Sequence, residues 1–250
     1  MQSLKVKVLS AVAIAAFVMA LPVTSMASGA VVGGLHSGNA ENGKKIFNEG
    51  KGDVPACNSC HGMTGMGDDA MGTPRLAGQG FTYIVKQLED FASDRRTDTT
   101  MFVMNANSKG LSAQDRKDVA AYVYHLGGGE GSDLMAVKEL GQPVGKSHLG
   151  KALVIYGAPE RGIPSCYACH QYNGRGAFPV YPQIGGQKYV YLVNQLMKWR
   201  DGSRANDPMA QMRKVAQKLS DDDIHNLAAY LTNAPKTTQG NATIPAEIMP

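Results

Sequence analysis

Cys57-Asn58-Ser59-Cys60-His61 occurs a second time in the chain as Cys166-Tyr167-Ala168-Cys169-His170. Two cysteines three positions apart, followed at once by histidine, are typical of the covalent attachment of a c-type haem. On one helical turn each thiol can join one vinyl group of the same porphyrin, and the adjacent imidazole can ligate the iron. The sequence therefore predicts two covalently bound haem c groups, attached at Cys57, Cys60, Cys166 and Cys169, with His61 and His170 as iron ligands.

Two other interpretations of a Cys-x-x-Cys pair are a zinc half-site and a redox-active dithiol. A zinc site needs further ligands, and no such set repeats in the second half. A redox dithiol does not need a histidine at the same offset twice. All 4 cysteines lie in the two motifs, so none is left for a disulfide.

The N-terminus has the three parts of a signal peptide: basic Lys5 and Lys7, an apolar run from Val8 to Leu21, and Ser25-Met26-Ala27 as a cleavage site. The alternative is an uncleaved membrane anchor, but the apolar run is shorter than the ~20 residues of a spanning helix. We expect residues 1–27 to be removed, and the mature protein to be periplasmic without a stable membrane span.

The composition is that of a globular protein of one or two domains, with 250 residues, 43% of them hydrophobic and 18% charged. The net charge of +4 falls to +2 without Lys5 and Lys7, and haem propionates would offset the remainder. No basic stripe with interleaved aromatic residues is present, which argues against nucleic acid as a partner.

The chain is a tandem repeat with a period of about 108 residues, which indicates duplication of a whole domain. Helical spacing of apolar residues predicts helices over 81–93 and 189–201, and Ser112 and Ser220 each open a further helix with a capping box. We expect an all-α fold of two domains, 28–126 and 149–235, joined by a linker at 127–148 and followed by an extended tail at 236–250.

A second iron ligand common to both halves should lie at matched positions. Two methionine pairs meet this condition, Met104 with Met212 and Met101 with Met209, whereas no histidine outside the motifs is matched. A thioether opposite histidine raises the reduction potential, as electron-transfer cytochromes require. We predict Met104 and Met212 as ligands, in a polar loop of each half, with Met101 and Met209 as the alternative pair.

Several nearby residues have predicted supporting roles. The backbone carbonyls of Pro74 and Pro182 are placed to accept the second N–H of each ligand histidine. Five further side chains are interpreted either as contacts to haem propionates or as solvated surface groups: Arg75, Tyr83, Tyr191, Arg96 and Arg204.

The ordered set of motifs resembles the dihaem cytochrome c4 family. Besides the two haem motifs, it comprises Pro-x-aliphatic-small-Gly-Gln (74–79 and 182–187), Tyr-x-x-x-Gln-Leu, the late methionine, and Leu-Ser-x-x-Asp before Ala-Ala-Tyr. The resemblance implies two class I cytochrome c folds with neighbouring haem edges. It also implies His/Met ligation of both irons and transfer of electrons to membrane terminal oxidases.

The leading hypothesis is an electron carrier, a monomer or weak dimer without catalytic residues, that passes electrons between redox partner proteins such as a membrane cytochrome complex or terminal oxidase. The alternatives are a cytochrome subunit of a larger dehydrogenase and a dihaem redox enzyme. A cysteine-ligated enzyme iron is excluded because no fifth cysteine exists.

Overall fold

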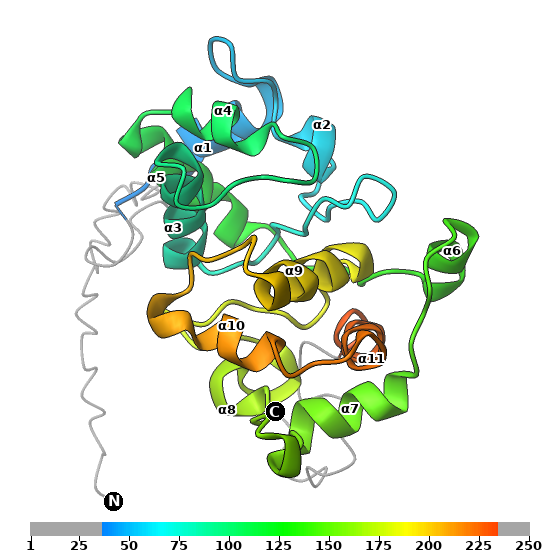
Figure 1. Cartoon of the computed structure of the whole chain (residues 1–250). Helices are drawn as coiled ribbons and strands as arrows, with labels where there is room; N and C mark the ends of the chain where they lie inside the picture. The colour runs from blue at the N-terminus through cyan, green and yellow to red at the C-terminus, as the bar shows by residue number, and fades with distance from the viewer. Residues whose placement is uncertain (1–36, 235–250) are drawn as a thin grey trace, which may run out of the picture. The chain divides into compact units, whose positions relative to one another are not determined.

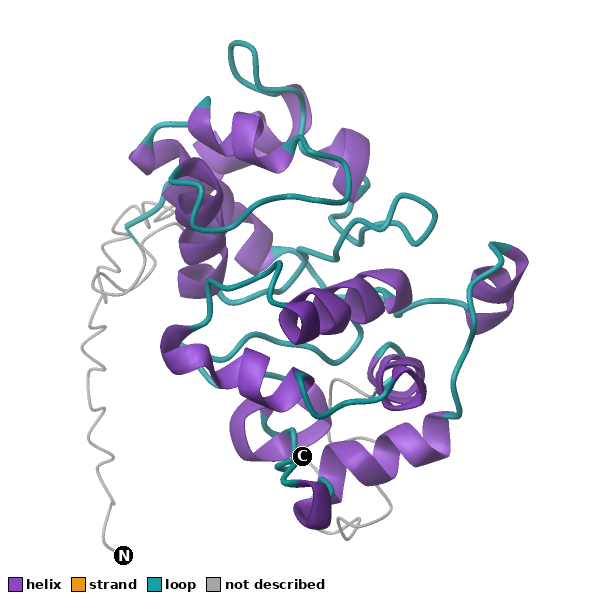
Figure 2. Ribbon diagram, viewed as in Figure 1, coloured by secondary structure: helices purple, strands orange, loops and turns teal. Residues whose placement is uncertain are grey.

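The computed structural model describes residues 37–234, so the predicted signal peptide (1–27) and tail (236–250) lie outside the described residues. The first half contains five helices: α1 (Ala40–Glu49), α2 (Asn58–His61), α3 (Phe81–Ala92), α4 (Met104–Lys109) and α5 (Ala113–His125) (Figure 1). The described chain holds only helices, loops and isolated bridges, which confirms the all-α prediction (Figure 2).

The second half repeats this order. It contains α7 (Ser147–Tyr156), η1 (Pro159–Arg161), α8 (Tyr167–His170), η2 (Tyr172–Gly174), α9 (Tyr189–Asp201), η3 (Pro208–Ala210), α10 (Gln211–Ala216) and α11 (Asp221–Leu231). The predicted helices over 81–93 and 189–201 correspond to α3 and α9. Between residues 37 and 234, no helix is long and apolar enough to cross a membrane.

In each half, the first and last helices cross at a glycine. A Cβ atom at Gly43 of α1 would lie 1.9 Å from the carbonyl oxygen of Asp118 in α5. A Cβ atom at Gly150 of α7 would lie 1.9 Å from the carbonyl oxygen of Asn226 in α11. Both distances are far inside van der Waals contact, so only glycine permits these close backbone approaches.

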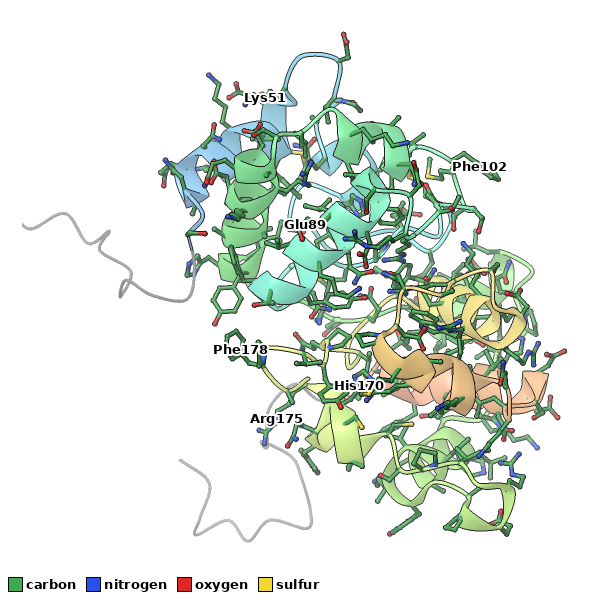
Figure 3. All side chains as sticks on the ribbon, turned by 60° about the vertical axis from the view of Figure 1, so that its left-hand side comes forward. Lys51, Glu89, Phe102, His170, Arg175 and Phe178 are labelled. Carbon is green, nitrogen blue, oxygen red and sulfur yellow. The ribbon has the colours of Figure 1, made fainter. Side chains whose placement is uncertain are left out.

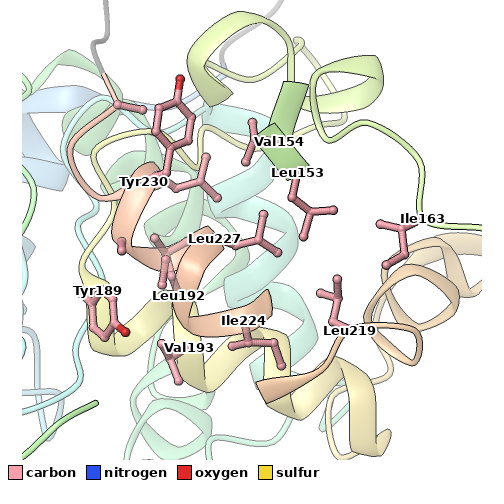
Figure 4. Close-up of a cluster of buried hydrophobic side chains, with 14 of the residues drawn as sticks. Leu153, Val154, Ile163, Tyr189, Leu192, Val193, Leu219, Ile224, Leu227 and Tyr230 are labelled. Atoms are coloured by element: carbon pink, nitrogen blue, oxygen red, sulfur yellow. The ribbon is translucent and has the colours of Figure 1, made fainter. Parts of the chain in front are cut away.

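Each half has its own apolar core, to which this helix pair contributes side chains. In the second half, α7, α9 and α11 contribute to one cluster (Figure 4). Its fully buried members are Val154, Tyr189, Ile224 and Ala228. The first half buries an equivalent set that includes Ile46, Phe47, Val119, Ala120 and Val123. Tyr189 lies in a helix that the apolar spacing predicted, and the core residues of α5 and α11 lie in helices that the capping boxes predicted.

The predicted linker contains a helix, α6 (Leu134–Glu139). The Val137 side chain of α6 is 1% exposed and joins the core of the second half. The backbone N–H of Ser132 also donates to the Thr232 hydroxyl at 2.8 Å. The predicted linker range therefore includes residues that pack on the second half, and the first turn of α7.

Both predicted capping boxes are confirmed, and the one at α5 has a consequence for acid stability. The buried Asp115 carboxylate accepts from Ser112 and from the Lys51 ammonium at 2.7 Å. Burial raises the pKa of Asp115, but these hydrogen bonds outweigh it and lower the pKa to about 2. Because this folded-state pKa lies below the unfolded value of ~3.9, the stabilisation is present above about pH 4 and disappears as the pH falls toward 2.

We expect Asp115→Asn to lower the free energy of unfolding at pH 7 by about 1–2 kcal/mol and to weaken its decline between about pH 4 and pH 2. Urea unfolding across this pH range measures both effects. Asp53→Asn removes an equal charge from an exposed position and should leave the curve nearly unchanged. An acid decline in Asp115→Asn as steep as in the unchanged protein would contradict the prediction.

Candidate functional site: two cysteine–histidine centres

Each Cys-x-x-Cys-His motif forms a short helix that turns its histidine inward. His61 at the end of α2 and His170 at the end of α8 are 6% and 7% exposed. Their Nδ1 atoms lie 3.1 Å from the Pro74 oxygen and 2.9 Å from the Pro182 oxygen, as predicted. A carbonyl oxygen only accepts, so Nδ1 carries the proton and Nε2 keeps its lone pair for a metal.

The protonation of the site fits haem attachment better than the alternatives. Burial lowers the pKa of His61 and of His170, only partly offset by the proline carbonyls, so both imidazoles are neutral at pH 7. Burial raises the pKa of Cys57 and of Cys166 to about 11, opposite to a reactive dithiol. Within residues 37–234, no three His, Cys, Asp or Glu side chains gather to hold a metal such as zinc.

A cavity of about 590 Å³ extends from one motif to the other. Its lining is mostly apolar and includes the cysteines and histidines of both motifs. Beyond the second motif, the exposed side chains of Arg175 and Phe178 point outward from the segment that follows His170 (Figure 3). A mostly apolar cavity beside two thiols and a neutral imidazole in each half suits a flat apolar macrocycle.

The four matched methionines are not equivalent in the structure. Met104 and Met212 are half-buried and line the cavity. Met209 is 76% exposed and is not among the cavity residues, whereas its counterpart Met101 is 37% exposed and lines the cavity. The prediction of a polar loop was wrong for three of them: Met104 begins α4, Met212 lies in α10 and Met209 lies in η3.

One residue that the sequence analysis missed holds the segment before Met104. The carboxylate of Asp98 accepts hydrogen bonds from four backbone N–H groups, those of Thr100, Met101, Val103 and Met104, at 2.9 to 3.4 Å. Burial raises the pKa of Asp98, but these hydrogen bonds outweigh it and lower the pKa. The signal available in the sequence was an aspartate six residues before Met104.

Arg75 tests whether the cavity suits a haem. The interpretation of Arg75 as a solvated surface group is wrong, because its side chain is 1% exposed and lines the cavity. Nη2 donates to the Gly185 carbonyl at 3.2 Å, but Nε and Nη1 have no partner among the described residues. Burial lowers the pKa of Arg75 to about 10, so it stays cationic at neutral pH. A buried cation with two unused donors fits an acidic group such as a haem propionate.

The repeated Gly-Gln segment joins the two halves. The Gln187 side chain accepts from the Arg75 backbone N–H at 2.6 Å and donates to the Arg75 carbonyl at 3.0 Å. The Gln79 side chain makes the same two bonds with the backbone of Gln183, at 2.9 and 2.8 Å. The sequence analysis assigned these glutamines no role, although their repetition at matched positions was the signal.

The remaining predicted supporting residues also lie between the halves. Arg96 and Arg204 are buried, so their interpretation as surface groups is wrong as well, and each bonds the tyrosine of the opposite half, Tyr191 or Tyr83. The two halves therefore contact each other through matched residues around one shared cavity. This fold and these sites define a tandem c-type cytochrome.

Comparisons with known proteins give the same class. The Cytochrome c family model matches residues 40–127 and 150–235. The thiosulfate dehydrogenase electron acceptor of Stutzerimonas stutzeri is 36% identical over 203 residues, 80% of this chain and 90% of that protein. Cytochrome c4 of Stutzerimonas stutzeri is 35% identical over 191 residues, covering 73% and 86%. The crystal structure of reduced cytochrome c4 from Pseudomonas stutzeri superposes with a TM-score of 0.66 at 33% identity, covering 80% of this chain and 100% of that one.

The chain belongs to the cytochrome c family, and within it to the dihaem cytochrome c4 group. Its two Cys-x-x-Cys-His motifs carry two covalently bound haem c groups, one in each half, as the sequence predicted. The resemblance inferred from the motifs is thus confirmed.

Proposed function

We propose that this protein is an electron carrier in which both irons have two protein ligands, His61 with Met104 and His170 with Met212. The observation that carries the proposal is the matched placement of these four side chains on the walls of one cavity. If these four residues hold the irons, neither centre would offer a place for substrate. The protein then acts as a carrier without catalytic residues.

Bound haem c supplies a one-electron iron couple, and the chain tunes that couple. The neutral imidazoles are oriented by Pro74 and Pro182, and the thioether ligands favour reduced iron. Burial keeps both histidines out of water. The glutamine contacts at the interface hold the two centres in one unit.

We infer that the domains are 28–126 and 149–235 with a linker at 127–148. We also infer a periplasmic location and a monomer or weak dimer.

Carbon monoxide binding tests the closed coordination of both irons. We expect the reduced protein at neutral pH to bind little carbon monoxide, because each iron already holds six ligands. A reductive titration should consume two electrons per chain. Absorption spectra recorded during both titrations provide the measurement. Rapid and complete carbon monoxide binding at one or both haems would overturn the proposal and favour a dihaem enzyme.

The identity of the donor is a narrower proposal. A relative at 36% identity over most of both chains is named as the electron acceptor of thiosulfate dehydrogenase. We infer that a thiosulfate-oxidising dehydrogenase is a candidate electron donor. A terminal oxidase would be the electron acceptor. Mixing oxidised protein with such an enzyme and thiosulfate should reduce both haems on the time scale of turnover. Reduction no faster than by thiosulfate alone would exclude this donor.

A further inference from the structure

Two arginines lie side by side between the halves. Arg96 follows α3 and Arg204 follows α9, at matched positions of the repeat. Their exposed fractions are only 7% and 6%. Both side chains line the cavity that also contains the cysteines of the two haem motifs. A charge at this place therefore lies on the wall of the cavity that the two centres share.

Each arginine is held by the opposite half of the chain. Nη2 of Arg96 donates to the Tyr191 hydroxyl at 3.0 Å and to Oε1 of Gln195 at 2.9 Å. Nη2 of Arg204 donates to the Tyr83 hydroxyl at 3.2 Å and to Oε1 of Gln87 at 3.0 Å. Displacing one arginine therefore disturbs contacts made by the other half.

The two guanidinium groups share the same acceptors. Oε1 of Gln87 also accepts from Nη1 of Arg96 at 2.7 Å, and Oε1 of Gln195 also accepts from Nη1 of Arg204 at 2.8 Å. Each guanidinium further lies over an aromatic ring of its own half, with Arg96 4.5 Å from the centre of Phe91 and Arg204 4.2 Å from that of Trp199.

All of these direct partners are neutral. Among residues 37–234, neither arginine forms an ion pair with a carboxylate. Two buried like charges bridged by neutral amide oxygens are unfavourable unless an anion lies nearby. Among the carboxylates that line the cavity, Asp98 lies near enough to Arg96 to favour its charge, and the acidic groups of the bound haems would be further anions facing the arginine pair.

We propose that Arg96 and Arg204 act as one shared positive centre, which positions acidic groups of both haems and raises both reduction potentials together. Oxidised haem iron carries one more positive charge than reduced iron, so a buried cation beside it favours the reduced form. An arginine serving only the haem of its own half would not need to be anchored in the other half. The inference rests on the proposed electron-carrier function, but potentials are measured without any partner protein, so the two fail independently.

The test is a spectroelectrochemical titration that resolves the two haems in the loaded protein. Arg96→Gln and Arg204→Gln should each lower both potentials. Arg96→Lys keeps the charge and should restore most of the shift. Arg95→Gln removes the same charge from the neighbouring residue, whose side chain is 61% exposed and pairs with Asp90 at 2.8 Å, and should shift both potentials much less than Arg96→Gln.

A shift confined to one haem in either glutamine variant would overturn the shared centre. So would an equal shift in Arg95→Gln, or a shift in Arg96→Lys as large as in Arg96→Gln. If both glutamine variants fail to fold while Arg95→Gln folds, the pair serves the fold instead of the potentials, and the proposal is also overturned.

Discussion

Replacing Met212 with alanine is expected to remove one of two methionine–iron charge-transfer bands in the near infrared and to open the second haem to carbon monoxide. The reduction potential of the second haem should fall by on the order of 0.1 V, a fraction of the ~0.8 V range that axial ligands span. The reason is the loss of the thioether that the cavity wall presents to the second centre. Met104→Ala should have the same effect on the first haem alone.

The exposed methionines provide matched controls for this experiment. Met209 is 76% exposed and lies outside the cavity, so Met209→Ala should keep both bands and both potentials. In the first half, Met101→Ala tests the alternative ligand directly, because Met101 lines the cavity beside Met104, and it should also keep both bands. Bands lost in Met209→Ala and kept in Met212→Ala would transfer the ligand assignment to Met101 and Met209.

The second large effect is expected at the helix crossings. Gly43→Ala and Gly150→Ala each place a Cβ atom 1.9 Å from a carbonyl oxygen of the facing helix. The facing atom belongs to a backbone, which cannot rotate away, so α1 must separate from α5, or α7 from α11. We expect each substitution to lower the free energy of unfolding by about 3 kcal/mol, the upper end of the usual cost of overpacking. Urea unfolding of the loaded protein measures this loss.

Gly127→Ala is the control for the helix crossings. A Cβ atom at Gly127 meets no other atom within 4 Å, so alanine there should leave stability within about 0.5 kcal/mol of the unchanged protein. The same unfolding curves show whether the two halves respond separately. Equal stability of Gly150→Ala and Gly127→Ala would contradict the close approach of α7 and α11.

Much of the candidate site could be predicted because it depends on short-range spacing and on the repeat. Cys57, Cys60 and His61 lie on one turn, so their order alone indicates a haem. The repeat then selected methionines over histidines, and it located the carbonyls of Pro74 and Pro182 that the structure places against the imidazoles. The capping box at Ser112 is equally local and was predicted correctly.

Other features depend on contacts between residues more than 90 positions apart. The spacing of Arg96 and Arg204 is equally compatible with a solvated surface, and only the packing of the two halves buries them. The helical start of Met104 is a local feature that was missed for another reason: the Asp98 carboxylate, and no apolar periodicity, holds the preceding segment. The helix α6 was missed because its 6 residues are too few to show apolar periodicity.

The sequence by itself determined the cofactor, the number of centres and the set of possible ligands, because covalent attachment and ligation depend on residue type at fixed local spacing. Only the tertiary structure decided which polar residues lie between the halves, since the burial of a long side chain is set by what packs against it. Gln79 and Gln187 illustrate the difference: the repeat shows that they correspond, but only the packed halves show that Gln79 binds the backbone of Gln183 and Gln187 that of Arg75.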